Sequence, residues 1–126
     1  MTTEPEKGSL EELVVWQRAM DVVDRVYKAT KNWPRDEVFG LVNQVRRAAV
    51  SVPSNIAEGH GRKGSGDFLR FVSIAYGSLM EVKTQILIGS RQGYSGKAET
   101  RDLLDSVDEV ARLLNGLKKA ISRNRS

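Results

Sequence analysis

Residues 68–86 read FLRFVSIAYGSLMEVKTQI, and this stretch decides the fold. Its apolar residues recur at alternating steps of three and four, which places them on one face of a helix. They are Phe68, Val72, Ala75, Leu79, Val82 and Ile86. This alternation, kept over about three heptads, is typical of helices that pack nearly parallel to one another. The stretch therefore predicts a long helix within a bundle.

Three other segments show the same spacing of apolar residues. The segment nearest the N-terminus carries Leu13, Trp16, Met20, Val23 and Tyr27. The next carries Val38, Val42, Val45, Ala49, Val52 and Ile56. The last carries Leu103, Val107, Val110, Leu114, Leu117 and Ile121. None of the segments alternates with a period of two, so we expect no strands.

The connections between these segments are short and rich in helix-breaking residues. They read NWPRD at 32–36, GHGRKGSG at 59–66 and SRQGYSG at 90–96. We expect Asp36 and Ser95 to cap the helices that follow them, and Gly59 to end a helix in the left-handed conformation. Short connections favour antiparallel neighbours, so the sequence predicts an all-α, up-down-up-down four-helix bundle.

The length of 126 residues is typical of one domain, and we expect a single domain over residues 1–126. Pro53 lies inside the second periodic segment, whose spacing continues through it, so we expect one helix kinked at Pro53. The helices are predicted at about 10–31, 36–58, 66–90 and 96–122.

Composition excludes several classes of function. The chain has no cysteine, and therefore no disulfide framework, thiolate nucleophile or Cys-ligated metal site. A single histidine excludes a multi-His metal site within one chain. No apolar run approaches the roughly 18 residues of a membrane span, and the acidic, polar start is unlike a secretory signal. We expect a cytoplasmic protein with no metal, no cofactor and no membrane association.

Charge is unevenly distributed along the chain. Residues 25–70 carry nine bases and four acids, whereas residues 97–110 carry five acids and two bases. Residues 111–126 carry five bases and no acid. Such segregation can bind polyanions, and it is equally compatible with a solvated surface on which neighbouring charges pair.

Seven basic residues are the candidate nucleic-acid contacts, because arginine and lysine near mobile backbone suit phosphate binding. They are Arg46, Arg47, Arg62, Lys63, Arg70, Lys118 and Lys119. The loop GHGRKGSG at 59–66 is not a P-loop, since it lacks the terminal GKS or GKT and follows no strand. The alternative is a helix connection whose basic character is incidental.

Catalytic and metal sites find little support. His60 lies two residues after Glu58, which alone is a weak indication of acid–base catalysis. Five acids near the start of the last helix lack the Glu-x-x-His element of di-iron bundles, and acids there also favour the helix dipole. These acids are Glu99, Asp102, Asp105, Asp108 and Glu109. We assign no catalytic residue and no metal ligand.

Two further surfaces are candidates for interaction. Phe71, Ile74 and Tyr76 fall off the main apolar stripe of their helix, which predicts burial on a second side and hence a subunit interface. A strip of small and charged polar residues on the second helix is compatible with an interface, a groove or plain solvent exposure. It consists of Arg47, Ser51, Ser54, Asn55 and Glu58.

The segment RRAAVSVPSNIAEGHGR at 46–62 resembles the bacterial 23S rRNA intervening-sequence protein family. The stretches at 12–30, 36–89 and 113–121 are similar to the same family, so the resemblance covers about residues 10–121. It implies a four-helix-bundle protein that assembles as a homopentamer. A structurally similar accessory protein of diversity-generating retroelements forms a basic pentameric barrel that binds a reverse transcriptase and nucleic acid. The family has no established catalytic motif.

We therefore expect a non-enzymatic, oligomeric protein that binds RNA or a ribonucleoprotein through basic patches and has no evident small-molecule substrate. The alternative is a protein–protein scaffold, or an accessory factor for a polymerase, reverse transcriptase or nuclease, without direct nucleic-acid contact. An enzyme is the third hypothesis, and it would need a convergent cluster of titratable groups in a pocket.

Overall fold

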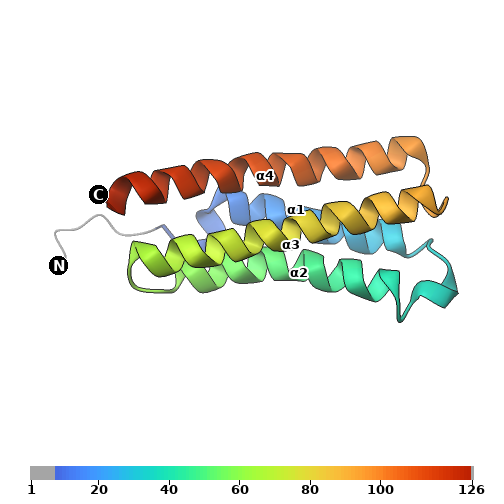
Figure 1. The fold of residues 1–126 in the computed structure, drawn as a ribbon, viewed down its shortest axis with the longest axis horizontal. Coiled ribbons are helices and arrows are strands. Elements are labelled where there is room, and N and C mark those ends of the chain that lie inside the picture. Colours follow the sequence, from blue (N-terminus) through green and yellow to red (C-terminus); the bar gives the residue numbers. More distant parts are fainter. Residues whose placement is uncertain (1–7, 126) are drawn as a thin grey trace.

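The computed structural model describes residues 8–125, which form four long helices packed side by side (Figure 1). The helices are α1 (Val14–Thr30), α2 (Leu41–His60), α3 (Ser65–Arg91) and α4 (Lys97–Arg125). Consecutive helices run in opposite directions in Figure 1, and each packs mainly against two others, so that α1 and α3 both contact α2 and α4. Residues 8–125 contain no strand, and the predicted all-α bundle is confirmed.

Two of the helices begin later than predicted, because short 3-10 turns precede them. The turn η1 (Leu10–Glu12) comes before α1, and η2 (Arg35–Glu37) comes before α2. The expectation that Asp36 caps the second helix is wrong, since it lies inside η2. A Glu37 carboxylate oxygen instead accepts a hydrogen bond from the Leu41 N–H, at 3.2 Å, at the start of α2.

Gly59 does not end α2 in the left-handed conformation, because the helix continues to His60. Among the described residues, a positive φ occurs only at Gly64 and Gly93. Gly59 is instead required by close packing, since a Cβ there would lie 2.9 Å from the Cβ of Phe71. The glycine therefore lets α2 and α3 approach each other closely.

The helix α2 runs without a break through Pro53, which is buried. The prediction of a single helix across this residue is confirmed. The kink at Pro53 stays a prediction.

Most of the predicted core is buried as expected. Of the three stripes in α2, α3 and α4, only Val38, Phe68 and Leu117 are not fully buried. Val38 lies before the start of α2 and is 47% exposed. The remaining members form one continuous apolar core with α1 and Trp33.

The predicted stripe of α1 is wrong in phase. The buried residues are Val15, Ala19, Val22, Val26 and Thr30, whereas Met20 is 38% and Tyr27 39% exposed. α1 carries two adjacent apolar stripes, and periodicity alone does not say which one faces the core. The stripe with the smaller side chains faces inward, where it permits closer helix packing.

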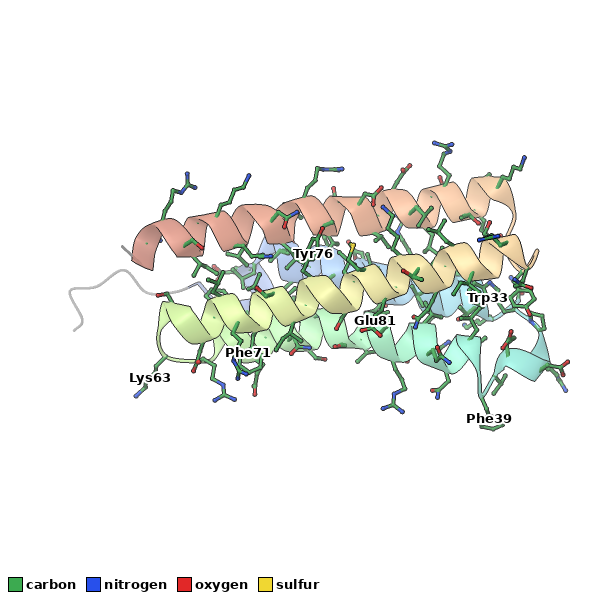
Figure 2. All side chains as sticks on the ribbon, viewed as in Figure 1. Trp33, Phe39, Lys63, Phe71, Tyr76 and Glu81 are labelled. Atoms are coloured by element: carbon green, nitrogen blue, oxygen red, sulfur yellow. The ribbon has the colours of Figure 1, made fainter. Side chains whose placement is uncertain are left out.

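Contacts between the α1–α2 connection and the α3–α4 connection close one end of the bundle. The buried indole of Trp33 donates a hydrogen bond from Nε1 to Ser95 Oγ at 2.9 Å (Figure 2). Ser95 lies two residues before α4 and binds this indole, so it does not cap the helix as expected. The Tyr94 hydroxyl donates to Glu37 Oε2 at 2.9 Å, and this bond raises the pKa of Tyr94 above its usual value.

Gly89 and Gly77 provide a matched test of this packing within α3. A Cβ at Gly89 would lie 2.7 Å from Trp33 Cζ2, whereas a Cβ at Gly77 would meet no atom within 4 Å. We expect Gly89→Ala to destabilise the protein by about 1–2 kcal/mol, because overpacking outweighs the gain in helix propensity. Gly77→Ala should stabilise it by up to about 1 kcal/mol. Chemical denaturation monitored by circular dichroism measures both, and equal effects of the two variants would contradict the packing described here.

Candidate nucleic-acid interface

Two groups of basic residues that are distant in sequence meet at one end of the bundle. The α2–α3 turn, the start of α3 and the C-terminal part of α4 all lie at this end in Figure 1. We call these six cations the basic end: Arg62, Lys63, Arg70, Lys118, Lys119 and Arg123. Antiparallel packing thus gathers charges that the sequence separates by about half of the chain.

A groove of about 500 Å³ runs between α3 and α4 at the basic end. Its lining is Leu69, Ser73, Lys118, Lys119, Ser122 and Arg123. Lys119 is exposed, while Lys118 is half-buried with its Nζ 5.1 Å from the centroid of the Tyr76 ring. The groove combines three cations with two hydroxyl groups and has no carboxylate in its lining, which suits an anionic ligand.

The other part of the basic end surrounds Phe71. The guanidinium carbons of Arg62 and Arg70 lie 5.2 Å and 4.8 Å from the centroid of this ring. Arg62 also pairs with Glu58 at 2.9 Å. Lys63 projects from the turn into solvent (Figure 2). The two arginines are therefore held in place by contacts that leave them accessible.

Arg46 and Arg47 do not join the basic end, because both lie in the first half of α2. Arg46 donates hydrogen bonds from Nε to Thr30 Oγ1 at 2.9 Å and from a terminal nitrogen to the Tyr27 carbonyl at 3.3 Å. Its guanidinium also lies 4.6 Å from the centroid of the Tyr27 ring. Arg46 therefore fastens the end of α1 to α2, whereas Arg47 is exposed.

The residues predicted to form a subunit interface do not share one surface. In Figure 2, Tyr76 lies on the edge of α3 that faces α4, and Phe71 lies on the edge that faces α2. Ile74 is 41% exposed, whereas the other two are half-buried. Phe71 contacts Arg70 of the basic end, and Tyr76 contacts Lys118.

An apolar groove between α1 and α2 was missed by the sequence reasoning. It is lined by Leu10, Trp16, Met20, Val23, Val50, Pro53, Ser54 and Ala57. Met20 and Val50 are 38% and 41% exposed within it. The periodicity of Trp16, Met20 and Val23 is the available signal, but the same periodicity is also typical of a core stripe.

The polar strip of α2 is largely occupied by contacts within the bundle. Ser51 Oγ lies 2.8 Å from Ser78 Oγ of α3, and Asn55 Nδ2 donates to Ser51 Oγ at 2.9 Å. Ser54 Oγ donates to the Val50 carbonyl at 2.8 Å. Part of this strip therefore joins α2 to α3, and small residues suit that role because the helices lie close together.

Of the titratable candidates, His60, Asp108 and Glu109 form structural contacts. His60 Nε2 lies 2.9 Å from the Gly8 carbonyl, and its ring packs edge-on against Phe68. Asp108 pairs with Lys83 at 3.0 Å, and Glu109 with Arg18 at 3.5 Å. Within residues 8–125, no group of three or more His, Asp or Glu side chains is placed to hold a metal ion.

Comparisons with known proteins agree with this architecture. The model of the 23S rRNA-intervening sequence protein family matches residues 11–116. A protein of unknown function from the S23 ribosomal protein family of Bacteroides thetaiotaomicron has a similar structure, with a TM-score of 0.78 and 20% sequence identity. The similarity covers 84% of this chain and 96% of that chain. No curated protein matches the sequence. In the described part of the chain, no helix is both long and apolar enough to span a membrane.

The contrast between Arg46 and Arg47 yields a test of their placement. We expect Arg46→Ala to destabilise the protein by about 1–2 kcal/mol, because it removes hydrogen bonds and a cation–π contact with the end of α1. Arg47→Ala, at an exposed position, should change stability by less than about 0.5 kcal/mol. Urea denaturation measures both values. A larger loss for Arg47→Ala than for Arg46→Ala would contradict this assignment.

Proposed function

This chain belongs to the 23S rRNA-intervening sequence protein family, and we propose that it acts without catalysis, by binding RNA or a ribonucleoprotein through the basic end. The observation that carries this proposal is the meeting of two basic groups, one at the α2–α3 turn and one on α4, at the same end of the bundle. A cytoplasmic location is part of the proposal.

The mechanism is electrostatic. Exposed lysines such as Lys63 and Lys119 would contact phosphate oxygens and displace the counterions condensed around them. Arg62 and Arg70 are held on Phe71, so less side-chain entropy is lost when they bind. Among the six cations of the basic end, Arg62 is paired with Glu58, whereas the α3–α4 groove that Lys118, Lys119 and Arg123 line has no carboxylate in its lining.

The composition of the α3–α4 groove favours binding over catalysis. Its polar side chains are Ser73 and Ser122 together with cations, and its lining has no imidazole or carboxylate to activate a hydroxyl group. Such a lining suits the binding of a phosphate better than the activation of a hydroxyl group by an imidazole or a carboxylate.

We also propose that copies of this chain associate, in line with the homopentamer that the family resemblance implies. The apolar groove between α1 and α2 supports this, because Met20, Val50 and half-buried Trp16 place a continuous apolar strip at the surface. The occupant that we assign to this groove is a second copy of the chain. A chain that stays monomeric would leave the groove open to a protein partner, which is the second candidate function.

Reversing the charge of two exposed lysines tests the RNA proposal. We expect Lys63→Glu with Lys119→Glu to weaken RNA binding and to lower the slope of log K against log salt by about 0.7–0.9 for each lost phosphate contact. The matched control is Lys31→Glu with Lys97→Glu, which makes the same change in net charge at the opposite end of the bundle. Fluorescence anisotropy with a structured RNA, titrated across salt, measures both.

Equal losses in the two double variants would mean that net charge, and not the basic end, governs binding. No binding by the wild type even at low salt would overturn the RNA proposal and favour the protein scaffold.

Self-association is tested by a charge placed in the apolar groove. We expect the wild type to have a mass in solution several times that of the 14.0 kDa chain. Val50→Asp should dissociate it, because a carboxylate would be desolvated at the interface. Ile74→Asp, at an equally exposed apolar residue on α3, should leave the assembly intact. Multi-angle light scattering gives the masses, and a monomeric wild type, or dissociation by Ile74→Asp alone, would contradict the proposal.

A further inference from the structure

The arrangement around Phe71 differs from the other contacts between cations and aromatic rings in the described part of the chain. Tyr27 has Arg46 over its ring, and Tyr76 has Lys118. Phe71 has two arginines, Arg62 at 5.2 Å and Arg70 at 4.8 Å from the ring centroid. Two planar guanidinium groups thus gather around one half-buried ring at the surface.

This cluster is held in place by the bundle. Gly59 of α2 approaches the Phe71 side chain so closely that a Cβ there would lie 2.9 Å from its Cβ. Glu58 holds Arg62 at 2.9 Å, yet the Arg62 side chain remains 47% exposed. A guanidinium that packs on a ring and is also open to solvent can accept a nucleobase, because bases stack on arginine planes and on aromatic rings.

The cluster continues into the groove between α3 and α4. Arg70 is followed one helical turn later by Ser73, and Leu69 and Ser73 are likewise neighbours on the helix surface. Leu69 and Ser73 line the groove together with Lys118 and Lys119. A belt of side chains therefore crosses α3. On the α2 side it consists of the Phe71 ring and its two guanidinium groups, and on the α4 side it consists of the lysines of the groove.

The size of this belt favours a single strand over a duplex. It extends across one helix, about 10–12 Å wide with its side chains, and the adjoining groove. Domains that recognise double-stranded RNA by its shape span about 16 base pairs, and paired bases inside a duplex are not free to stack on a protein side chain. An unpaired strand can present both a base and its phosphates to a surface of this size.

We propose that the basic end binds a short single-stranded RNA segment, with one base stacked on the Arg70–Phe71–Arg62 cluster. The adjoining phosphates lie along the groove on Lys118, Lys119 and Arg123. This inference rests on the proposed RNA binding, and it specifies the class of RNA and the side chains that distinguish it.

The test separates stacking from charge. Arg70→Lys keeps the charge and removes the planar group, and Phe71→Leu keeps an apolar side chain and removes the ring. The matched control is Arg101→Lys, at an exposed arginine in the acidic half of α4. The probes are a short unstructured RNA labelled with fluorescein and the duplex that it forms with its complement, with inorganic polyphosphate as competitor.

We expect the wild type to bind the single strand more tightly than the duplex at the same salt. Arg70→Lys and Phe71→Leu should weaken single-strand binding roughly 5- to 150-fold, the range for loss of a base-stacking contact. The salt dependence of Arg70→Lys and the competition by polyphosphate should be unchanged, because the charge is kept. Arg101→Lys should behave as the wild type.

Two outcomes overturn this inference while RNA binding stands. One is equal affinity for single strand and duplex, and the other is wild-type affinity of Arg70→Lys for the single strand. Failure to bind either form of RNA overturns the proposed function as well. Thermal melting identifies any loss of folding in Phe71→Leu, and Arg70→Lys, a change of an exposed side chain, then carries the test alone.

Discussion

The close approach of α2 and α3 is the constraint on which the rest of the structure depends. Gly59 lies against Phe71 with no room for a side chain, and Ser51 and Ser78 are joined across the helices at 2.8 Å. Small residues at these positions let the two backbones come together, because larger ones would force them apart. The same contact positions the α2–α3 turn over the start of α3, and hence Arg62 beside Phe71 and Arg70.

Antiparallel packing converts a charge pattern along the chain into a charge pattern in space. α4 changes from an acidic N-terminal half to a basic C-terminal half, so its charge runs along the bundle axis. Because α3 runs in the opposite direction, the end of α4 lies beside the start of α3, and their side chains form one groove. The proposed RNA binding uses the polarity of α4, since phosphates would approach its basic C-terminal half, which lines the groove, and not its acidic N-terminal half.

Much of the fold was predictable because, in α2, α3 and α4, the periodic apolar stripe of the sequence is the one that faces the core. Leu79 and Val107 are fully buried, as the spacing required. α1 was misread because it has two adjacent stripes with the same period, and only the packing against α2 and α4 decides between them. The predicted start of α2 was also too early, because the 3-10 turn η2 precedes the helix. Glu37, and not Asp36, accepts a hydrogen bond from the first N–H of α2.

The candidate site was predictable only in part, because its geometry is tertiary. Lys63, Arg70 and Lys119 were identifiable from local charge, but only the packing of α3 against α4 determines which of their side chains line a common groove. Arg46 was included although it fastens α1 to α2, a contact between residues far apart in sequence. Arg123 lies four residues after Lys119, so the two share one face of α4 and the sequence does contain a signal for this member of the site.

Cross-linking of the wild-type protein to a short single-stranded RNA by ultraviolet light, with the linked peptides identified by mass spectrometry, tests the central claim most directly. The account predicts cross-links in two regions, around Phe71 at the start of α3 and at 118–123 in α4. Cross-links confined to the groove between α1 and α2, or to the acidic half of α4, would contradict it.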